Sequence, residues 1–305
     1  MIKKVIKGII RILIPRERIH YKIIKHLSKI LNDISIYDLG ASYFYHKRFE
    51  VFYRSRNTIL NSVDPNAKNL SYLDDWRFES EIKIHPFAVG GKNEVSILNI
   101  TKIDSGSSLL NFDFNNNNEH RIVKNNLLPI KKKKIKLKSF NDIFKETIRE
   151  NDLAIFKIDI QGTELDVLES IIDVDLKKKI LCVEVESGIA KDPVNHSEKG
   201  IIHLFNYFDK IDFEIIDVKV VRYLLPKANK ILKTQNVPKE CDWVFMKKFS
   251  HIIKQNVDYQ ITAVACYISY NLYGEAIEII RRLLKSHEID SRRKTVLEKV
   301  LKLLI

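Results

Sequence analysis

The sequence has little cysteine. Its three cysteines, Cys182, Cys241 and Cys266, lie far apart in a chain of 305 residues. No CxxC or Cys/His spacing occurs, so neither a zinc site nor a disulfide framework is indicated. This usage is typical of a reducing compartment, and we expect a cytoplasmic protein.

Long apolar runs are also missing. No run approaches the roughly 18 residues that a membrane-spanning helix needs. The N-terminal MIKKVIKGIIRILIP is interrupted by Lys7 and Arg11 and has no small-residue cleavage site, so we do not expect a signal peptide. Its isoleucines recur at helical spacing up to Pro15, and a second helix is expected over 16–32, so residues 1–33 form a basic helical segment. Two interpretations of residues 1–14 stay open: a helix lying on the anionic inner membrane face, or one that packs on the main domain.

Acidic residues are outnumbered. The chain has 52 Lys and Arg against 39 Asp and Glu, a net charge of +13. Such a balance favours an anionic partner, or it reflects only a lysine-rich composition. Nucleic acid is the partner expected least, because no Asn-Pro-Pro-Tyr-type motif and no cysteine beside proline is present. We interpret the lysine run KKKKIKLKSF at 131–140 as a solvated strand edge rather than a phosphate patch.

What the sequence does contain is an alternation of short strands and helices over residues 34–250. This pattern predicts an α/β domain with a mostly parallel sheet, helices on both faces and an antiparallel edge strand. The expected strands are 34–42, 58–66, 81–91, 94–100 (a hairpin partner of 81–91), 131–140, 153–160, 180–187, 213–221 and 241–249. Residues 251–305 are helical only and resemble one tetratricopeptide-type helix pair. Such a pair cannot bury its own apolar face, so it should dock on the domain or on a partner protein.

Polar side chains recur at the predicted strand ends. In an open parallel sheet, ligands bind beyond the carboxyl ends of the strands, at the switch in strand order. The residues at these positions are Asp38 and Gly40, Asp64, Asp159 and Gln161, and Glu184 and Glu186. An acid about 20 residues after a glycine turn can accept hydrogen bonds from both ribose hydroxyls of an adenosine cofactor. The turn DLGASYF has one glycine where a dinucleotide fingerprint has three, which favours S-adenosylmethionine, since it lacks a pyrophosphate. The alternative is that Gly40 makes only a strand-to-helix turn.

One block of sequence carries a family resemblance. KIDIQGTELDVLES at 157–170, followed by LCVEVES at 181–187, resembles the central signature of the FkbM-type S-adenosylmethionine-dependent methyltransferases. YDLGA, SVDPN, HPFAVGG and DSGSSLL resemble other segments of that family, so the match covers about residues 35–249.

The resemblance implies a Rossmann-like methyltransferase fold and methyl transfer to an oxygen, often of a sugar hydroxyl. By position, Asp38, Gly40 and Ala41 would border the methionine end of S-adenosylmethionine, Asp64 the ribose, and Phe87, Ala88 and Val89 the adenine. The family usually has a further glycine near Phe44. This departure leaves open a second hypothesis, a non-catalytic binding or scaffold protein with a methyltransferase fold.

Three residues are candidates for the catalytic chemistry. Asp159, at the end of a central strand, could remove the proton of the acceptor hydroxyl, or could pair with Lys157. Glu164 could serve as acceptor or metal ligand, or could stabilise the first turn of its helix. His85, like His196, is a candidate base, although a lone histidine is more often structural.

Three further polar residues are candidates for substrate contacts. Glu184 and Glu186 are two residues apart in a strand and therefore share a face. Together with Gln161, these carboxylates could bind sugar hydroxyls. They could also hold a divalent cation, which we do not predict.

These observations lead to one expected function. We expect an O-methyltransferase that acts on a sugar hydroxyl of a cell-surface glycan or a glycosylated intermediate. Residues 1–14 would keep it near the inner membrane face, and the C-terminal helices would offer a surface to a protein partner.

Overall fold

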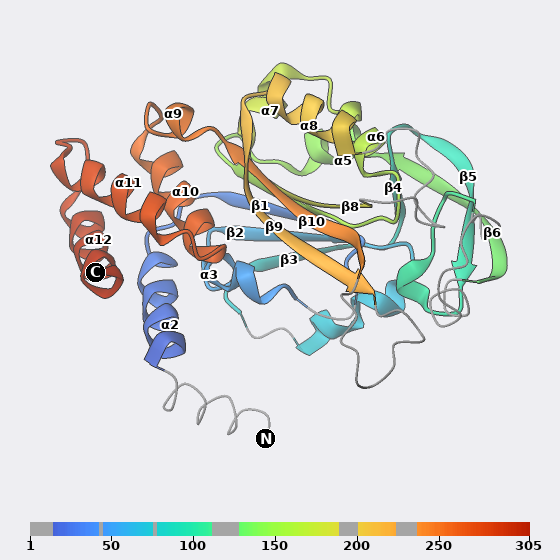
Figure 1. Ribbon diagram of the computed structural model, residues 1–305, viewed down its shortest axis with the longest axis horizontal. Coiled ribbons are helices and arrows are strands. Elements are labelled where there is room, and N and C mark those ends of the chain that lie inside the picture. Colours follow the sequence, from blue (N-terminus) through green and yellow to red (C-terminus); the bar gives the residue numbers. More distant parts are fainter. Residues whose placement is uncertain (1–14, 43–44, 76–77, 112–127, 189–200, 224–236) are drawn as a thin grey trace.

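A seven-stranded sheet forms the centre of the molecule in this computed structural model (Figure 1). The structure describes residues 15–42, 45–75, 78–111, 128–188, 201–223 and 237–305, so the predicted helix over 1–14 lies outside the described residues. The strands, in the order in which they pair, are β3 (Glu81–His85), β2 (Thr58–Val63), β1 (Ile34–Leu39), β7 (Leu153–Ile158), β8 (Ile180–Gly188), β10 (Val237–Lys247) and β9 (Phe213–Tyr223). The strand order reverses between β1 and β7, which makes this the switch point of the sheet.

Helices cover both faces of this sheet (Figure 1). One face packs against α5 (Phe140–Thr147), α6 (Glu164–Ser170), α7 (Val174–Lys179) and α8 (Ile201–Lys210). The other face packs against α2 (Pro15–Leu27), α3 (Glu50–Tyr53) and α10 (Val257–Ser269). Strands β1 and β2 are buried along their whole length, which explains their near-continuous apolar sequence.

The predicted fold class is confirmed, with a refinement at one edge. Strands β3, β2, β1, β7 and β8 are parallel, and β10 is antiparallel to both β8 and β9. The antiparallel strand is therefore β10, one place in from the edge.

A second, three-stranded sheet stands beside the first in the order β4-β6-β5. It contains β4 (Ala88–Gly90), β5 (Glu94–Thr101) and β6 (Pro129–Ser139). The single strand predicted over 81–91 is wrong. The chain leaves the large sheet after His85 and, after Pro86 and Phe87, enters the small sheet as β4. The predicted hairpin of 81–91 with 94–100 is also wrong, since β5 pairs with β6.

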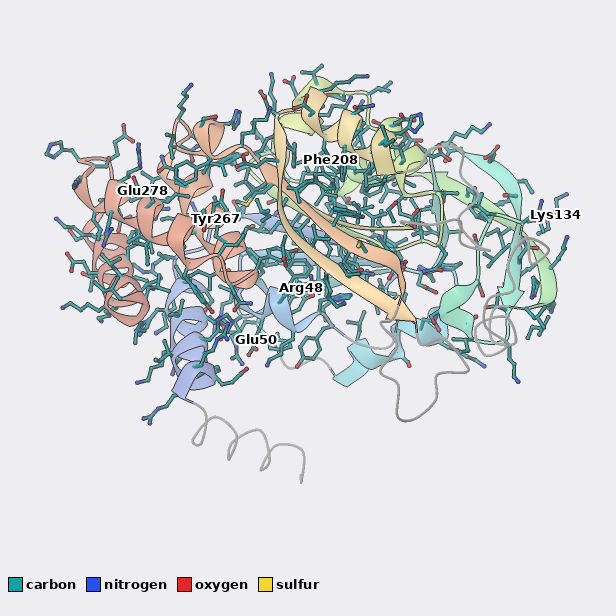
Figure 2. All side chains as sticks on the ribbon, viewed as in Figure 1. Arg48, Glu50, Lys134, Phe208, Tyr267 and Glu278 are labelled. Atoms are coloured by element: carbon teal, nitrogen blue, oxygen red, sulfur yellow. The ribbon has the colours of Figure 1, made fainter. Side chains whose placement is uncertain are left out.

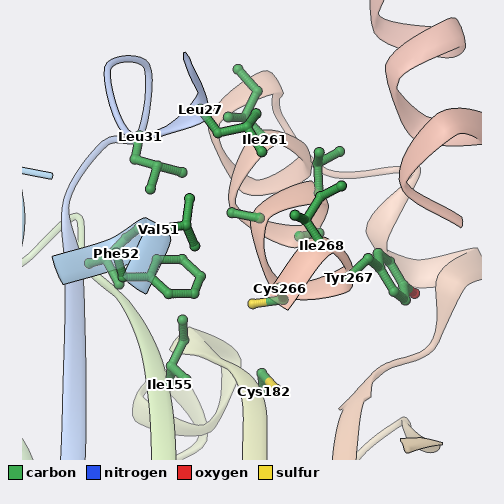
Figure 3. Packing of buried hydrophobic residues seen from close by; sticks show 14 of the residues in the cluster. Leu27, Leu31, Val51, Phe52, Ile155, Cys182, Ile261, Cys266, Tyr267 and Ile268 are labelled. Atoms are coloured by element: carbon green, nitrogen blue, oxygen red, sulfur yellow. The ribbon is translucent and has the colours of Figure 1, made fainter. Parts of the chain in front are cut away.

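The C-terminal helices α10, α11 (Tyr273–Lys285) and α12 (Ser291–Leu304) pack on the main domain. Figure 3 shows Cys266 of α10 on the side of the helix toward Val51 and Phe52 of α3, and all three belong to one buried cluster. The C-terminal helices therefore contribute to the core that supports the sheet. Short helical turns complete the chain: η1 (Lys47–Phe49), η2 (Ala67–Asp75), η3 (Asp104–Gly106) and α9 (Phe249–Ile252).

Within the part of the chain that the structure describes, no helix combines the length and the hydrophobicity needed to cross a bilayer.

Candidate functional site

The turn after β1 brings two strand ends into close contact. Gly40 has a φ of +83°, and a Cβ atom there would lie 1.8 Å from the carbonyl oxygen of Asp159. The Asp159 N–H in turn donates to the Leu39 carbonyl at 3.0 Å. Only glycine fits this crossing, so Gly40 has a reason inside the fold beyond any approach to a ligand.

A cavity of about 420 Å³ opens at this switch point, between the carboxyl ends of β1, β2 and β7 and the inner face of the small sheet. The sequence-predicted residues that line it are Gly40, Asp64, Phe87, Ala88, Val89, Asp159 and Gln161. The other predicted residues lie behind or away from its wall: Asp38, Ala41, His85, Glu164, Glu184 and Glu186.

Asp64, at the end of β2, is oriented by the turn that follows it. Its Oδ1 accepts hydrogen bonds from the Asn66 N–H at 2.7 Å and from the Asn69 side-chain amide at 3.1 Å. Burial raises the pKa of Asp64 to about 6, an effect that these two hydrogen bonds oppose. The Asn66 side chain also donates to Asp104 across the cavity rim. Asn66, Asn69 and Asp104 were missed from the sequence, although the Asx spacing of Asp64 and Asn66 is a usable signal.

The small sheet supplies one wall of the cavity. Leu98, Ile100 and Ile135 give it an apolar surface, and Lys131 and Lys133 lie on the same face. The lysine run was predicted to be a solvated strand edge, and the correction is that two of its lysines, Lys131 and Lys133, face the cavity. The pairing of β6 with β5, which sets this alternation, has no signal in the local sequence.

Asp38 is buried at the end of β1, beside Lys157. The sheet register places Asp38, Lys157 and Glu184 side by side on one face of β1, β7 and β8. Burial raises the pKa of Asp38 to about 6, and Lys157 opposes this rise. Desolvation would lower the pKa of Lys157, but Asp159 and Asp38 outweigh it and raise that pKa, so the lysine stays protonated.

Asp159 lies at the end of β7 and is held from two sides. Its Oδ2 accepts from Lys157 Nζ at 2.8 Å and its Oδ1 from Gln161 Nε2 at 2.9 Å. Burial opposes ionisation, but Lys157 and the hydrogen bonds around the carboxylate hold the pKa of Asp159 well below its usual range. Gln161 Nε2 also donates to Glu186 Oε2 at 2.9 Å. Lys157, Asp159, Gln161 and Glu186 therefore form one polar group, called the Asp159 group below, in which the Asp159 side chain is 32% exposed.

Glu164 closes the turn between β7 and α6. Gln161 and Gly162 both have positive φ angles, of 62° and 113°. The Glu164 carboxylate accepts from the Ile160 N–H at 3.1 Å and from the Gly162 N–H at 2.9 Å. Burial raises the pKa of Glu164 to about 7 despite these backbone donors. This arrangement corresponds to the structural alternative for Glu164 and places its carboxylate away from the cavity wall.

Glu184 is engaged inside the core, at 2% exposure. Its Oε2 accepts from Arg48 at 2.9 Å and from the Tyr270 hydroxyl of α10 at 2.9 Å. The predicted substrate contact of Glu184 is therefore corrected: the carboxylate joins the sheet to η1 and to the C-terminal helices. Neither Arg48 nor Tyr270 was found from the sequence, because both are remote from Glu184 along the chain.

Two further predicted residues and one unpredicted histidine lie outside the cavity lining. The His85 Nε2 contacts Asn61 Oδ1 at 3.1 Å, and Ala41 is buried in the core. His196 lies outside the described residues. His46, which the sequence did not single out, is close to the Asp159 group. Burial, with Lys157 and Arg48, lowers the pKa of His46 to about 3, so its imidazole is neutral.

The cavity fits S-adenosylmethionine. Two cavity-lining residues have a buried oxygen without a hydrogen-bond partner among the described residues, Ser42 Oγ and Thr163 Oγ1, and Asp38 Oδ1 behind the wall has none either. A polar ligand would supply the missing partners, because buried polar atoms without one are costly. The Asp64 carboxylate suits a ribose, and the apolar wall of the small sheet suits an adenine. Phe44 lies outside the described residues, but Ser42 of the same turn lines the cavity.

In the described part of the chain, no group of three or more His, Cys, Asp or Glu side chains is arranged to hold a metal ion.

Comparison with known proteins gives one strong match. The family model "Methyltransferase FkbM domain" matches residues 38–219. No curated protein matches the chain. Solved structures that resemble it include precorrin-6y C5,15-methyltransferase from Geobacter metallireducens, with 8% identity, a TM-score of 0.34, and coverage of 76% of this chain and 89% of the other. TehB from Haemophilus influenzae has 11% identity, a TM-score of 0.35, and coverage of 74% and 61%. These TM-scores are too low to carry an argument, so the assignment rests on the family match and the strand order.

Proposed function

Because this chain belongs to the FkbM methyltransferase-domain family, we propose that its cavity binds S-adenosylmethionine and that the methyl group passes to a sugar hydroxyl of a glycan or a glycosylated intermediate. Family membership makes the chain an S-adenosylmethionine-dependent methyltransferase. The proposal adds the residues that hold the cofactor and the class of acceptor. One observation carries it: a cavity at the sheet switch point, with Asp64 on its wall at the end of β2 and the Asp159 group at the end of β7, on the other side of β1.

The cofactor end of the proposal assigns three roles. The Asp64 carboxylate would accept hydrogen bonds from the ribose hydroxyls. The Asn66 N–H and the Asn69 amide already hold this carboxylate in place through its Oδ1. Phe87 and Val89 would contact the adenine. S-adenosylmethionine, when bound, supplies a methyl group on a positively charged sulfur, and the buried Asp38 would stabilise that charge.

The acceptor end of the proposal rests on Asp159, Gln161 and Glu186. The two carboxylates and the Gln161 side-chain carbonyl oxygen can accept hydrogen bonds from the hydroxyls of a sugar, while the Gln161 amide nitrogen already donates to Asp159 and Glu186. Lys157 keeps Asp159 ionised, so this carboxylate would orient the attacking hydroxyl by accepting its hydrogen bond. A carboxylate of such low pKa holds a proton poorly, so the proton would pass on to water at the exposed side of Asp159.

Calorimetric titration with S-adenosylhomocysteine tests the cofactor site. The wild-type chain should bind in the micromolar range, which corresponds to about −8 kcal/mol. Asp64→Ala should bind about 100-fold more weakly, because it removes two hydrogen bonds to a charged acceptor worth about 1.5 kcal/mol each. Glu288→Ala, at an exposed acid before α12, is the control and should bind like wild type. Unchanged binding in Asp64→Ala would contradict the assigned pocket.

Transfer of a labelled methyl group to a panel of sugars and nucleotide sugars tests the acceptor site. Asp159→Asn should lower turnover by about 100-fold, the lower range for a positioned acid or base. Its affinity for S-adenosylhomocysteine should stay within about threefold of wild type, a difference below 1 kcal/mol. If wild type binds the cofactor product but methylates no sugar, the acceptor class is wrong while the cofactor site stands.

A further inference from the structure

The small sheet has an outer face that lies away from the cavity. In the antiparallel β5–β6 pair, Lys132, Lys134 and Lys136 stand opposite Asn99, Ile97 and Val95. Directly opposed residues share a face of a sheet. This set alternates with Lys131 and Lys133, which line the cavity, and so points outward. Figure 2 shows Lys134 at the outer edge of the molecule, at the end farthest from the C-terminal helices.

This outer face combines exposed lysines with exposed aliphatic side chains. Val95 and Ile97 of β5 are each 53% exposed, and Ile130, near the start of β6, is 68% exposed. Lys132, Lys134 and Lys136 are all exposed as well. We call Val95, Ile97, Lys132, Lys134 and Lys136 the basic apolar face.

Protection of a strand edge does not account for this face. Lysines on an exposed strand discourage pairing with other chains, and that purpose is served best when the neighbouring exposed positions are polar. Here the lysines stand directly opposite Val95 and Ile97, so the face presents two aliphatic side chains to solvent. A face of this kind needs a partner that is anionic and apolar at once.

We propose that the basic apolar face docks on an anionic lipid bilayer. The ammonium groups would contact lipid headgroups, while the lysine stems, Val95 and Ile97 would enter the boundary with the acyl chains. A nucleic acid or an acidic glycan would satisfy the lysines but would leave the aliphatic side chains in water. The combination therefore favours a bilayer over a polyanion.

Docking in this way places the cavity next to the membrane. The inner face of the same two strands carries Leu98, Ile100, Lys131 and Lys133, all on the cavity wall. The sheet is one strand-layer thick, so the bilayer would lie directly behind that wall. An acceptor attached to a lipid would then approach the cavity without leaving the membrane surface.

Vesicle flotation with the full-length protein tests the proposal. Wild type should float with vesicles of equimolar phosphatidylcholine and phosphatidylglycerol, and not with pure phosphatidylcholine. The triple variant Lys132→Gln/Lys134→Gln/Lys136→Gln should bind about 100-fold more weakly, because each lysine near an anionic surface contributes about fivefold. Val95→Ser/Ile97→Ser should also weaken binding, although it leaves the charge unchanged.

Two control variants separate this face from general basicity and from the N-terminal segment. Lys285→Gln/Lys294→Gln/Lys302→Gln removes the same charge from exposed positions on α11 and α12, at the other end of the molecule, and should bind like wild type. Lys3→Gln/Lys4→Gln/Lys7→Gln measures the share of residues 1–14. If only this last variant loses binding, or if wild type binds neither vesicle, the proposal is overturned.

Binding to polyanions and the fluorescence of an introduced tryptophan provide two further tests. Binding to heparin or duplex RNA that depends on the three lysines but not on Val95 and Ile97, with no vesicle binding, would overturn the bilayer in favour of a polyanion. Ile97→Trp should show a blue-shifted fluorescence on mixing with anionic vesicles, as the indole enters an apolar environment. Circular dichroism should show the variants in β5, β6, α11 and α12 folded, since the side chains substituted there are exposed.

Discussion

Two sets of carboxylates lie near the carboxyl ends of the parallel strands, one set facing the cavity and the other facing the interior. Asp64 and Asp159 line the cavity. Their oxygens are oriented by Asn66 and Asn69 in the first case and by Lys157 and Gln161 in the second. Glu164 and Glu184 lie behind the cavity wall, where backbone N–H groups, Arg48 and Tyr270 engage their oxygens. A position at the end of a strand therefore brings an acid near the cavity, while its hydrogen-bond partners decide whether its carboxylate can contact a ligand.

The difference has an energetic side. An acid in the interior contributes to the free energy of folding through internal partners, and its removal should affect stability more than binding. An acid at the cavity should affect binding more than stability. The changes below test this division, from the largest expected effect to the smallest.

Gly40→Ala should have the largest effect, because it removes the crossing on which both sets depend. The new Cβ would meet the Asp159 carbonyl at 1.8 Å, and the residue would keep a φ near +83° that alanine rarely adopts. We expect a loss of more than about 4 kcal/mol, above the usual range for point mutants, with little folded protein recovered. Gly274→Ala is the matched control, since a Cβ there meets nothing within 4 Å. Urea unfolding followed by circular dichroism measures both, and equal stability of the two variants would contradict the close crossing.

Glu184→Ala should separate the interior set from the cavity set. It breaks the pair with Arg48 and leaves the Tyr270 hydroxyl without this acceptor, so we expect a loss of about 4 kcal/mol. Its affinity for S-adenosylhomocysteine should stay within about threefold of wild type, a difference below 1 kcal/mol.

Glu186→Ala is the comparison for this variant, two residues further along the same face of β8. It should cost less than about 1 kcal/mol of stability, because the residue is partly exposed and its hydrogen bond comes from a neutral amide, that of Gln161. Thermal unfolding and calorimetry of both variants check the division. A stable Glu184→Ala with lost cofactor affinity would reverse it.

The sequence predicted the large sheet well, because each strand has its own apolar run and its own turn residues. It also found Gly40, Asp64 and Asp159, since the strand-end rule needs only local strands and their order. It missed the surroundings that decide what each acid does. Arg48 and Tyr270 are 136 and 86 residues away from Glu184, and no local pattern announces such contacts.

The small sheet was missed for the same reason. Strand β6 pairs with β5 across residues 102–128, and only that register assigns alternate lysines to the cavity or to the outer face. The sequence shows that neighbouring lysines point to opposite faces of a strand, but it does not show which face lies against the cavity.

Asp38→Asn should show how a charge buried behind the cavity wall affects stability with pH. The folded-state pKa of Asp38 is about 6, raised from 3.8 by burial. Between these values the folded chain binds more protons than the unfolded chain, so stability falls as pH rises through this window and stays low above it. The variant lacks the charge, so it should be more stable than wild type by about 3 kcal/mol at pH 7 and about equal near pH 4. Denaturant unfolding at both pH values measures this, with the exposed Asp209→Asn as control; a stability gap that does not change with pH would contradict the buried charge.

Tyr270→Phe should have a smaller effect than Glu184→Ala and shows how the C-terminal helices support the site. The variant removes one hydrogen bond, of 2.9 Å, from α10 to the Glu184 carboxylate, while Arg48 remains paired with the same oxygen. We expect a loss of about 1.5 kcal/mol, typical of a hydrogen bond to a charged group, and unchanged affinity for S-adenosylhomocysteine. Tyr273→Phe, whose hydroxyl donates to Asn271 at the surface, is the control and should cost less than about 0.5 kcal/mol. In a double-mutant cycle with Glu184→Ala, the double variant should lose less stability than the two single variants together, because both changes remove the same hydrogen bond. Full additivity would mean that α10 is anchored elsewhere, and that the C-terminal helices stabilise the domain without bearing on the strand that ends beside the cavity.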